Sequence, residues 1–436
     1  MTKMEGNANL SLKIVDGKVT DVKFSVKEYK RFFTEAMKGK NIVAIPQHLA
    51  RICGTCSNSH IMCSIEACEN ALGITPTTQT KILRALMMHG LMIRDHALHL
   101  YLFSMPDIFG KDAFLDFDEN DPAQHQILHD GFDVKSAGNF LATLIAGRSV
   151  HATLPTIGGF LKFPDQTGMD EAIQKLQNIR PAVLRLIEIF KNAPFHFDRK
   201  TKYMALVPDD TFGYINGNIV TSSGEKYGEK DFRTHLESTV LPYSQAVGYT
   251  YKDEGYMVGA LPRVNLAKDK LHPKTKESAA EALSLFPSTD IFYNNLAQAI
   301  EILHSVDESI DILSKNKFVP EPLVKPLSDS AAVSAVGVGV IEAPRGTLYH
   351  KVILGGDAKV VGGEVVVPTG QNQINIERDI GVLVQKLIDE SNSTASDAAP
   401  LDKAKIGFEI EKLIRAYDPC MSCAAHFLKV EWEENL

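Results

Sequence analysis

The chain opens with a pattern that is typical of a β-hairpin. Apolar and polar residues alternate over residues 10–14 and again over 19–24, and Asp16 and Gly17 lie between the two stretches. Alternation places every second side chain on one face of a strand, and Asp-Gly is a strong hairpin signal. The sequence therefore predicts two antiparallel strands at the start of the chain.

The period changes to that of a helix between Thr77 and Ser104. Leucine, isoleucine and methionine recur at spacings near 3.6 from Ile82 to Leu100, on a stripe wide enough for a helix that is buried on most sides. Other periodic and glycine-punctuated stretches predict helices over 133–147, 169–192, 277–316, 377–391 and 402–416, strands over 203–223 and 333–368, and a surface loop over Ser391–Leu401.

These elements predict an α+β fold that is mainly α, with a large helical core and small antiparallel sheets. Strands and helices do not alternate as they would in a parallel α/β fold. No linker-like segment divides the chain, so we expect residues 1–436 to form a single large domain.

Composition excludes several classes of protein. The 436 residues are 44% hydrophobic and 23% charged, enough to bury a core without disulfide bonds. The net charge of −8 gives no basic footprint for nucleic acid. No apolar run is long enough to span a membrane, and the first residues do not resemble a signal peptide, so we expect a cytoplasmic protein.

The cysteines form two clusters near opposite ends of the chain. Of the six, four lie between Cys53 and Cys68 and two are Cys420 and Cys423, with 420 − 68 − 1 = 351 residues between the clusters. A disulfide framework would spread its cysteines along the chain. Each cluster instead contains a C-x-x-C, which indicates metal or redox chemistry in a reducing compartment.

Spacing alone leaves the metal open. Two thiols two residues apart can reach one ion, and four thiolates suit zinc, copper(I), an iron–sulfur cluster or nickel. A structural zinc site is one alternative and a redox dithiol is another. Zinc ribbons place their pairs about 15–20 residues apart, whereas Cys420 follows Cys56 by 420 − 56 = 364 positions.

The sequence around the cysteines resembles one family. Residues 51–60 read R-x-C-G-x-C-x-x-x-H and residues 418–426 read D-P-C-x-x-C-x-x-H, the paired signatures of the large, catalytic subunit of nickel–iron hydrogenases. Three further segments are similar to that family: E-A-P-R-G at 342–346, D-H-x-x-H at 95–99, and Glu5-Gly6, where Asn7 replaces the family's histidine. Length and the short C-terminal tail look most like the cytosolic bidirectional members.

The resemblance implies the reversible heterolytic cleavage of dihydrogen to protons and electrons. A hydrogen-sensing or non-catalytic electron-transfer subunit of the same fold is the alternative. Metal-free relatives in respiratory complex I lack the cysteines, and this chain has all four.

The resemblance also implies the metal ligands. Nickel would be held by Cys53, Cys56, Cys420 and Cys423, of which Cys56 and Cys423 would bridge to an iron that carries carbon monoxide and two cyanides. In the family, the terminal histidine, here His426, binds a magnesium or iron ion together with a glutamate from an R-G-x-E segment. The corresponding stretch here is displaced by one residue, and its glutamate is Glu35.

Proton transfer is assigned by the same resemblance to two residues. Cys420 would be the first base, and Glu5 would carry the proton outward. A solvated charge at the N-terminus is the structural alternative for Glu5. His60 would hydrogen-bond to the sulfur of a bridging cysteine.

The segment that contains Arg345 is expected to act by electrostatics. Its guanidinium would lie over the open metal position, held by Asp95 and Asp418, with Pro344 fixing the backbone. A purely structural ion pair is the alternative.

The implied partners are an iron–sulfur small subunit and further flavin or iron–sulfur electron-transfer subunits. Residues 427–436 resemble the tail that a maturation protease removes from precursors of this family, although an ordinary C-terminal strand is the alternative.

Overall fold

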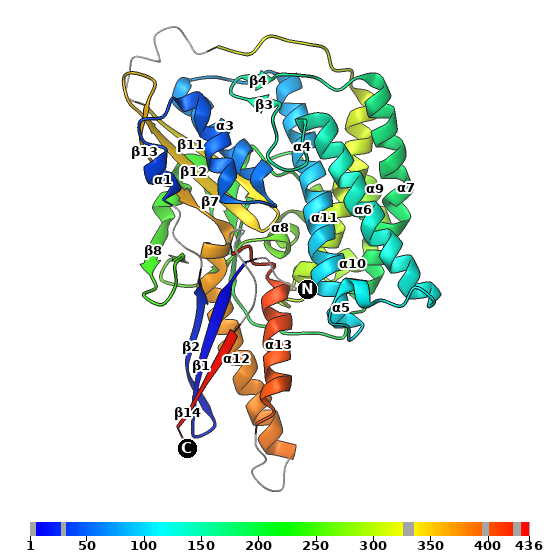
Figure 1. Ribbon diagram of the computed structural model, residues 1–436, viewed down its shortest axis with the longest axis vertical. Coiled ribbons are helices and arrows are strands. Elements are labelled where there is room, and N and C mark those ends of the chain that lie inside the picture. Colours follow the sequence, from blue (N-terminus) through cyan, green and yellow to red (C-terminus); the bar gives the residue numbers. More distant parts are fainter. Residues whose placement is uncertain (1–5, 28–31, 326–334, 395–400, 422–428, 436) are drawn as a thin grey trace.

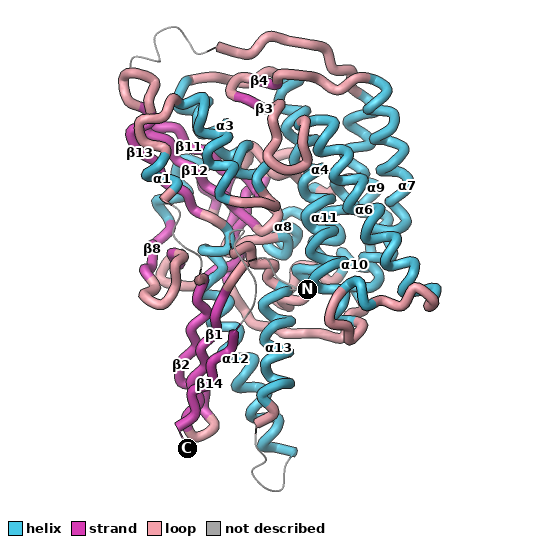
Figure 2. The backbone as a smooth tube through the Cα atoms, viewed as in Figure 1, coloured by secondary structure: helices cyan, strands magenta, loops and turns pink. Residues whose placement is uncertain are grey.

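Long helices gather on one side of the molecule and most strands lie on the other (Figures 1 and 2). The computed structural model describes residues 6–27, 32–325, 335–394, 401–421 and 429–435. Its helical block consists of four helices that pack side by side, namely α4 (Thr78–Ala97), α6 (Pro122–Ala146), α7 (Gln166–Lys191) and α11 (Tyr293–Lys315). The mainly helical α+β class predicted from the sequence is confirmed.

Side-chain caps set where these helices begin. Thr77 accepts a hydrogen bond from the Thr80 N–H at the start of α4, and Asp121 accepts from two N–H groups at the start of α6. Such caps satisfy N–H groups that have no partner inside the helix. The Asp121 cap explains why α6 begins well before the predicted residue 133. The predicted helix over 77–104 is confirmed, with π-helical geometry over Leu98–Ser104 before α5 (Met105–Ile108).

The predicted helix over 277–316 is wrong in its first part. The region contains α9 (Pro273–Ser278), α10 (Ala280–Ser284) and α11, separated by an irregular segment that includes Pro287. Proline lacks the N–H that a helix interior needs. The Asp290 carboxylate then accepts from the N–H of Phe292, the residue immediately before α11.

A three-stranded antiparallel sheet faces the helical block. Its strands are β11 (Ala335–Ala343), β12 (Gly346–Leu354) and β13 (Val360–Val366), and α3 (Ser57–Leu72) packs across the first two. A Cβ atom at Gly337 or Gly339 would overlap a backbone carbonyl of α3. The two glycines therefore let the helix lie unusually close to the sheet.

Both ends of the chain meet in a second small sheet. The predicted hairpin is confirmed as β1 (Ala8–Val15) and β2 (Lys18–Val26), and β14 (Lys429–Asn435) pairs with the free side of β1. This sheet extends away from the main body beside α12 (Pro368–Thr394) and α13 (Lys403–Ala416) (Figure 1). Helix α12 includes residues 391–394, so the predicted loop over Ser391–Leu401 is wrong at its start.

Among the described residues, most strand pairs are antiparallel, as predicted, and two are parallel. Strand β14 runs parallel to β1, and β10 runs parallel to β5. Both parallel pairs join segments far apart in sequence, which local patterning does not reveal. The remaining elements are β3 (Pro155–Thr156), β4 (Gly159–Phe160), β5 (Lys202–Val207), β6 (Asn218–Thr221), β7 (Lys226–Gly228), β8 (Leu236–Val240), β9 (Val247–Tyr251), β10 (Tyr256–Met257), α1 (Phe33–Ala36), α2 (Ile45–Leu49) and α8 (Ala260–Ala267).

The largest buried apolar cluster includes residues from Ala8 to Met421, so both ends of the chain contribute to one core. Among the described residues, none of the helices is both long and apolar enough to cross a bilayer.

Candidate metal centre

Cys53 and Cys56 lie at the N-terminal end of α3. The chain is extended at Cys53 and then turns, so that Cys56 immediately precedes the first helical residue, Ser57. The Cys56 N–H donates to the sulfur of Cys53 at 3.2 Å. The helix dipole at this end favours negative charge on a sulfur, whereas the neighbouring thiols and burial oppose it.

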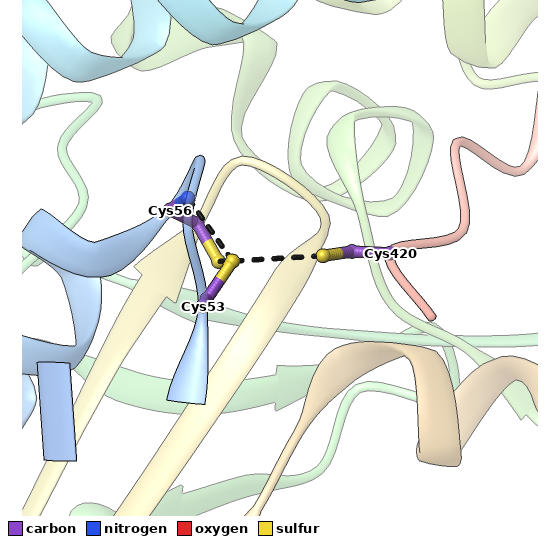
Figure 3. A group of neighbouring side chains, drawn as sticks. All are labelled: Cys53, Cys56 and Cys420. Carbon is purple, nitrogen blue, oxygen red and sulfur yellow. Dashed lines mark hydrogen bonds between the residues drawn. The ribbon is translucent and has the colours of Figure 1, made fainter. Parts of the chain in front are cut away.

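Cys420 reaches the same point from the other end of the chain. It follows α13 after a left-handed residue, Asp418 (φ 49°), and its N–H donates to the Thr369 hydroxyl at 3.0 Å. Its sulfur lies 3.6 Å from that of Cys53, which is 2.7 Å from that of Cys56 (Figure 3). All three sulfurs lie within 4.8 Å of one another.

A small, mostly apolar cavity adjoins these sulfurs. Its volume is about 50 Å³, enough for a small molecule such as a diatomic gas. Among the described residues, His60 and Arg345 are the charged or titratable side chains of the wall besides the cysteines. In the described part of the chain, the residues that line it are Ile52, Cys53, Cys56, His60, Ala343, Arg345, Leu348, Val367, Pro368, Thr369 and Cys420.

Arg345 lies in the tight connection between β11 and β12. Its Nη1 is 2.5 Å from Oδ2 of Asp95 on α4, and its Nη2 is 3.0 Å from Oδ1 of Asp418. All three side chains are buried. A planar guanidinium held by two carboxylates has little freedom to move, so its charge is fixed beside the cavity.

Comparison with known proteins shows which family has this arrangement. The family model described as nickel-dependent hydrogenase matches residues 31–166 and 226–426. The chain belongs to the nickel-dependent hydrogenase family. Relatives include sulfhydrogenase 2 subunit alpha of Pyrococcus furiosus, 30% identical over 98% of both chains, and sulfhydrogenase 1 subunit alpha of the same organism, 28% identical over 99% of this chain and 97% of the relative.

The fold of this hydrogenase chain is also found in solved structures. A NAD⁺-reducing [NiFe]-hydrogenase in the H₂-reduced state superposes with a TM-score of 0.83, at 24% identity over 97% of each chain. The two relatives matched in sequence are named as subunits.

Soft donors and burial both fit a nickel-dependent enzyme. Hydrogen bonding to Cys420 and Cys53, together with burial, raises the pKa of the Cys56 thiol. Thiolates this close repel one another in a low-dielectric site, so a bound cation is needed to hold them ionised. The residues present therefore fit a soft divalent metal such as nickel.

His60 lies in the cavity wall of the hydrogenase and is part of a hydrogen-bonded chain. Its Nδ1 is 3.1 Å from Nε2 of His350, whose Nδ1 is 2.9 Å from the Ser64 hydroxyl. Burial lowers the pKa of His60 to about 4, so the ring is neutral near pH 7. A hydrogen bond from His60 to a bridging sulfur stays a prediction.

Sequence reasoning missed several residues that shape the site. His350 lies on β12 behind His60, Thr369 fixes the backbone of Cys420, and the Gln298 amide donates to Asp418 at 2.9 Å. Each is a polar residue inside a buried stretch, which is the signal that could have singled it out. Without the fold, no spacing rule connects any of them to the cysteines.

Other predicted residues lie away from the sulfurs or outside the described chain. Glu35 is on the exposed α1, where it pairs with Lys38 at 2.6 Å. Glu5, Cys423 and His426 fall outside the described residues. Convergence of all four predicted cysteines is thus seen for the three that are described.

Proposed function

We propose that this chain is the catalytic subunit of a nickel–iron hydrogenase, which cleaves dihydrogen reversibly into two protons and two electrons. One observation carries the proposal: thiols from motifs 364 positions apart meet within 4.8 Å, beside a cavity that also contains Arg345. A fold that brings both ends of the chain to one point favours a metal centre over two separate dithiols.

Four cysteines would hold the metals. Cys53 and Cys420 would be terminal ligands of nickel, while Cys56 and Cys423 would bridge to an iron with carbon monoxide and two cyanides. Nickel and iron together supply Lewis acidity and redox capacity that side chains lack. A further magnesium or iron ion at His426, with Glu35 as a candidate ligand, belongs to the same proposal.

Protons would leave through Cys420 and Glu5. Splitting dihydrogen heterolytically requires a base beside the metals, and the Cys420 sulfur is one of the groups that line the cavity. Gly6 lies so close to Met421 that a Cβ added to it would be 2.6 Å from the Cβ of Met421. The residue after Glu5 therefore lies against the residue after Cys420, which supports a short path from sulfur to carboxylate.

Arg345 would stabilise charge that develops in the cavity during cleavage. The two carboxylates that hold it prevent the guanidinium from reorganising, so the field is in place before the reaction starts. Pro344 would restrict the backbone that carries it. His60 would tune the basicity of a bridging thiolate.

Electrons would pass to an iron–sulfur small subunit and from there to further flavin or iron–sulfur subunits. With four of the six cysteines committed to the metals, the remaining Cys63 and Cys68 are buried and hydrogen-bond to backbone carbonyls. A separate cluster bound by four cysteines of this chain is therefore ruled out by count. We place the complex in the cytoplasm because its cysteines form metal motifs rather than a disulfide framework.

The C-terminal segment 427–436 would be removed by a maturation protease. Strand β14 lies within that segment and pairs along β1, so cleavage would have to be followed by loss of this strand pairing. We further propose that residues 1–436 form a single large catalytic domain, of which 427–436 are the removable tail.

Metal analysis combined with turnover tests the proposed function. Purified complex should contain nickel and iron and should reduce a dye with dihydrogen, and Cys420→Ser should abolish both nickel and turnover. Zinc alone would establish the structural alternative. Nickel and iron with negligible turnover would favour the hydrogen sensor.

A further inference from the structure

A buried arginine that the proposed reaction does not use lies behind the Arg345 segment. Arg263 on α8 is 1% exposed, and its Nε and Nη2 donate to the two carboxylate oxygens of Glu301 on α11 at 2.6 and 2.7 Å. Its Nη1 donates to Glu342 at 2.7 Å. Burial would raise the pKa of Glu301, but the Arg263 charge lowers it to about 2, so this pair is ionised.

Arg263 also holds the backbone that leads into Arg345. Nη1 donates to the carbonyl of Ala343 and Nη2 to that of Pro344, each at 3.0 Å. These carbonyls belong to the two peptide units before Arg345, so the guanidinium of Arg263 fixes the position of the Arg345 backbone. A planar group with five donors can satisfy two carboxylates and two carbonyls at once, which an ammonium cannot.

The same ion pair reaches the other partner of Arg345. Oε2 of Glu301 is 2.8 Å from Nε2 of His96, and His96 follows Asp95 on α4. Asp95 in turn is 2.5 Å from Arg345. The contacts close a ring from Arg345 through Asp95, His96, Glu301 and Arg263 back to the backbone of Pro344.

We infer that Arg263 and Glu301 are positioning residues that set the Arg345–Asp95 contact. Among the described residues, neither of them lines the cavity or belongs to the group of three thiols. They link the loop that carries Arg345 to helix α4, which carries Asp95. Without them, the distance between Arg345 and Asp95 can increase. The inference rests on the proposed role of Arg345 in turnover.

The decisive variant is Arg263→Lys in the assembled enzyme. Lysine keeps a charge beside Glu301 but cannot span both carbonyls. At unchanged nickel and iron content we expect kcat to fall about 10- to 100-fold with little change in KM for dihydrogen, as for an ångström-scale misplacement of a preorganised group. Near-normal kcat at full metal loading, with the Arg345–Asp95 contact unchanged, would overturn the inference.

Arg180→Lys is the matched control. Arg180 pairs with Asp307 on the same helix α11, also through its Nε and Nη2, and its remaining hydrogen bond goes to Ser278. This variant should retain turnover even where it lowers the thermal midpoint as much as Arg263→Lys does. Equal losses of kcat in the two variants would show a general effect of weakening α11 and would contradict a positioning role.

A double-mutant cycle separates action through Arg345 from general damage. In Arg345→Lys the fork at the cavity is already lost, so adding Arg263→Lys should lower kcat little further. Losses that multiply would mean that Arg263 acts independently of Arg345, and the inference would fail.

A crystal structure provides a readout that does not depend on activity. In Arg263→Lys the Arg345–Asp95 contact should lengthen beyond hydrogen-bonding distance, whereas in Arg180→Lys it should be unchanged. An unmoved contact overturns the positioning inference even if the enzyme is active. A moved contact with normal kcat would instead reject the role proposed for Arg345.

Should Arg263→Lys fail to assemble with metals, Glu301→Gln takes its place. Glutamine keeps the shape of the side chain and leaves Arg263 present, but it weakens the link to His96. A fall in kcat at full metal content supports the inference, and wild-type kcat overturns it.

Discussion

At the residue scale, the site combines fixed charges with neutral histidines. Arg345 is buried between Asp95 and Asp418, while burial keeps His60 uncharged near pH 7. Charge near the cavity is therefore carried by groups that cannot rearrange, which is the condition for electrostatic stabilisation without reorganisation.

Arg345→Lys should lower turnover far more than metal content. Lysine retains the positive charge but loses the planar fork that two carboxylates hold, so its ammonium can swing away from the cavity. We expect a fall of about 10²–10³ in dihydrogen–dye turnover, the usual effect of losing one preorganised donor. The measurement needs nickel and iron assays on the same preparation, and wild-type turnover at full loading would reject the role of Arg345.

Protonation of the buried His304 should lower the free energy of unfolding in mild acid. Burial lowers its pKa to about 4, and its ring is satisfied as the neutral form, with Nε2 near the Phe212 carbonyl at 2.9 Å and Nδ1 accepting from the His272 N–H. The unfolded chain binds a proton near pH 6.5 and the folded chain only near pH 4. The contribution of neutral His304 to the free energy of unfolding is therefore fully present above about pH 6.5. It declines by about 3 kcal/mol as the pH falls to 4.

Unfolding free energies measured between pH 7 and 4 test this expectation. His304→Gln should lose stability at pH 7 but should show a shallower decline with acid. His125→Gln, at an exposed position on α6, is the control and should keep the wild-type slope. Identical slopes for wild type and His304→Gln would contradict the assignment.

At the scale of elements, close packing of α3 on β11 fixes one wall of the metal centre. Gly337 and Gly339 leave no room for a side chain against the helix that begins next to Cys56. A shift of this helix would move the two N-terminal thiols relative to Cys420.

Gly339→Ala should therefore damage both stability and metal content. Its Cβ would overlap the Cys63 carbonyl on α3, and overpacking of this kind costs about 1–3 kcal/mol. Gly407→Ala on α13 is the matched control. Apart from the backbone of its own helix and its two chain neighbours, none of the described residues has an atom within 4 Å of the added Cβ, and alanine favours the helix by about 0.5–1 kcal/mol. A thermal midpoint of Gly339→Ala equal to that of wild type would show that α3 and β11 can move apart to accommodate the added Cβ without loss of stability.

Local pattern predicts some elements of this fold and not others. The Asp16-Gly17 hairpin and the long apolar stripe of α4 follow directly from periodicity. The two parallel strand pairs do not, because their partners come from distant segments whose meeting depends on the whole fold. The cysteine motifs can be recognised from local spacing alone. Thr369 and His350 cannot, because their contacts with the site also depend on distant segments meeting in the fold.

At the scale of the whole molecule, the metal centre joins opposite ends of the chain. Cys53 and Cys56 precede all four helices of the helical block, and Cys420 follows them. A metal bound to both sets of thiols closes a loop that contains most of the protein, and binding that depends on the folded state stabilises that state.

Metal removal should lower the thermal midpoint by at least about 5 °C, since bound structural metals contribute several kcal/mol. Hydrogen exchange should increase first around residues 53–60 and 417–421, where the two ends meet. The core of α4 and α11 should stay protected. A uniform increase in hydrogen exchange across the chain would contradict a local stabilising effect of the metal at the point where the two ends meet.

The late position of Cys420 has a consequence for synthesis on the ribosome. Translation proceeds at about 5–20 residues per second, so the second group of thiols emerges roughly 20–70 s after Cys56. Strand β14, which covers the edge of β1, emerges last of all. During that interval the N-terminal thiols and the open edge of β1 belong to a nascent chain that cannot yet enclose a metal, so both need protection from oxidants and from stray strand pairing until the last few residues arrive.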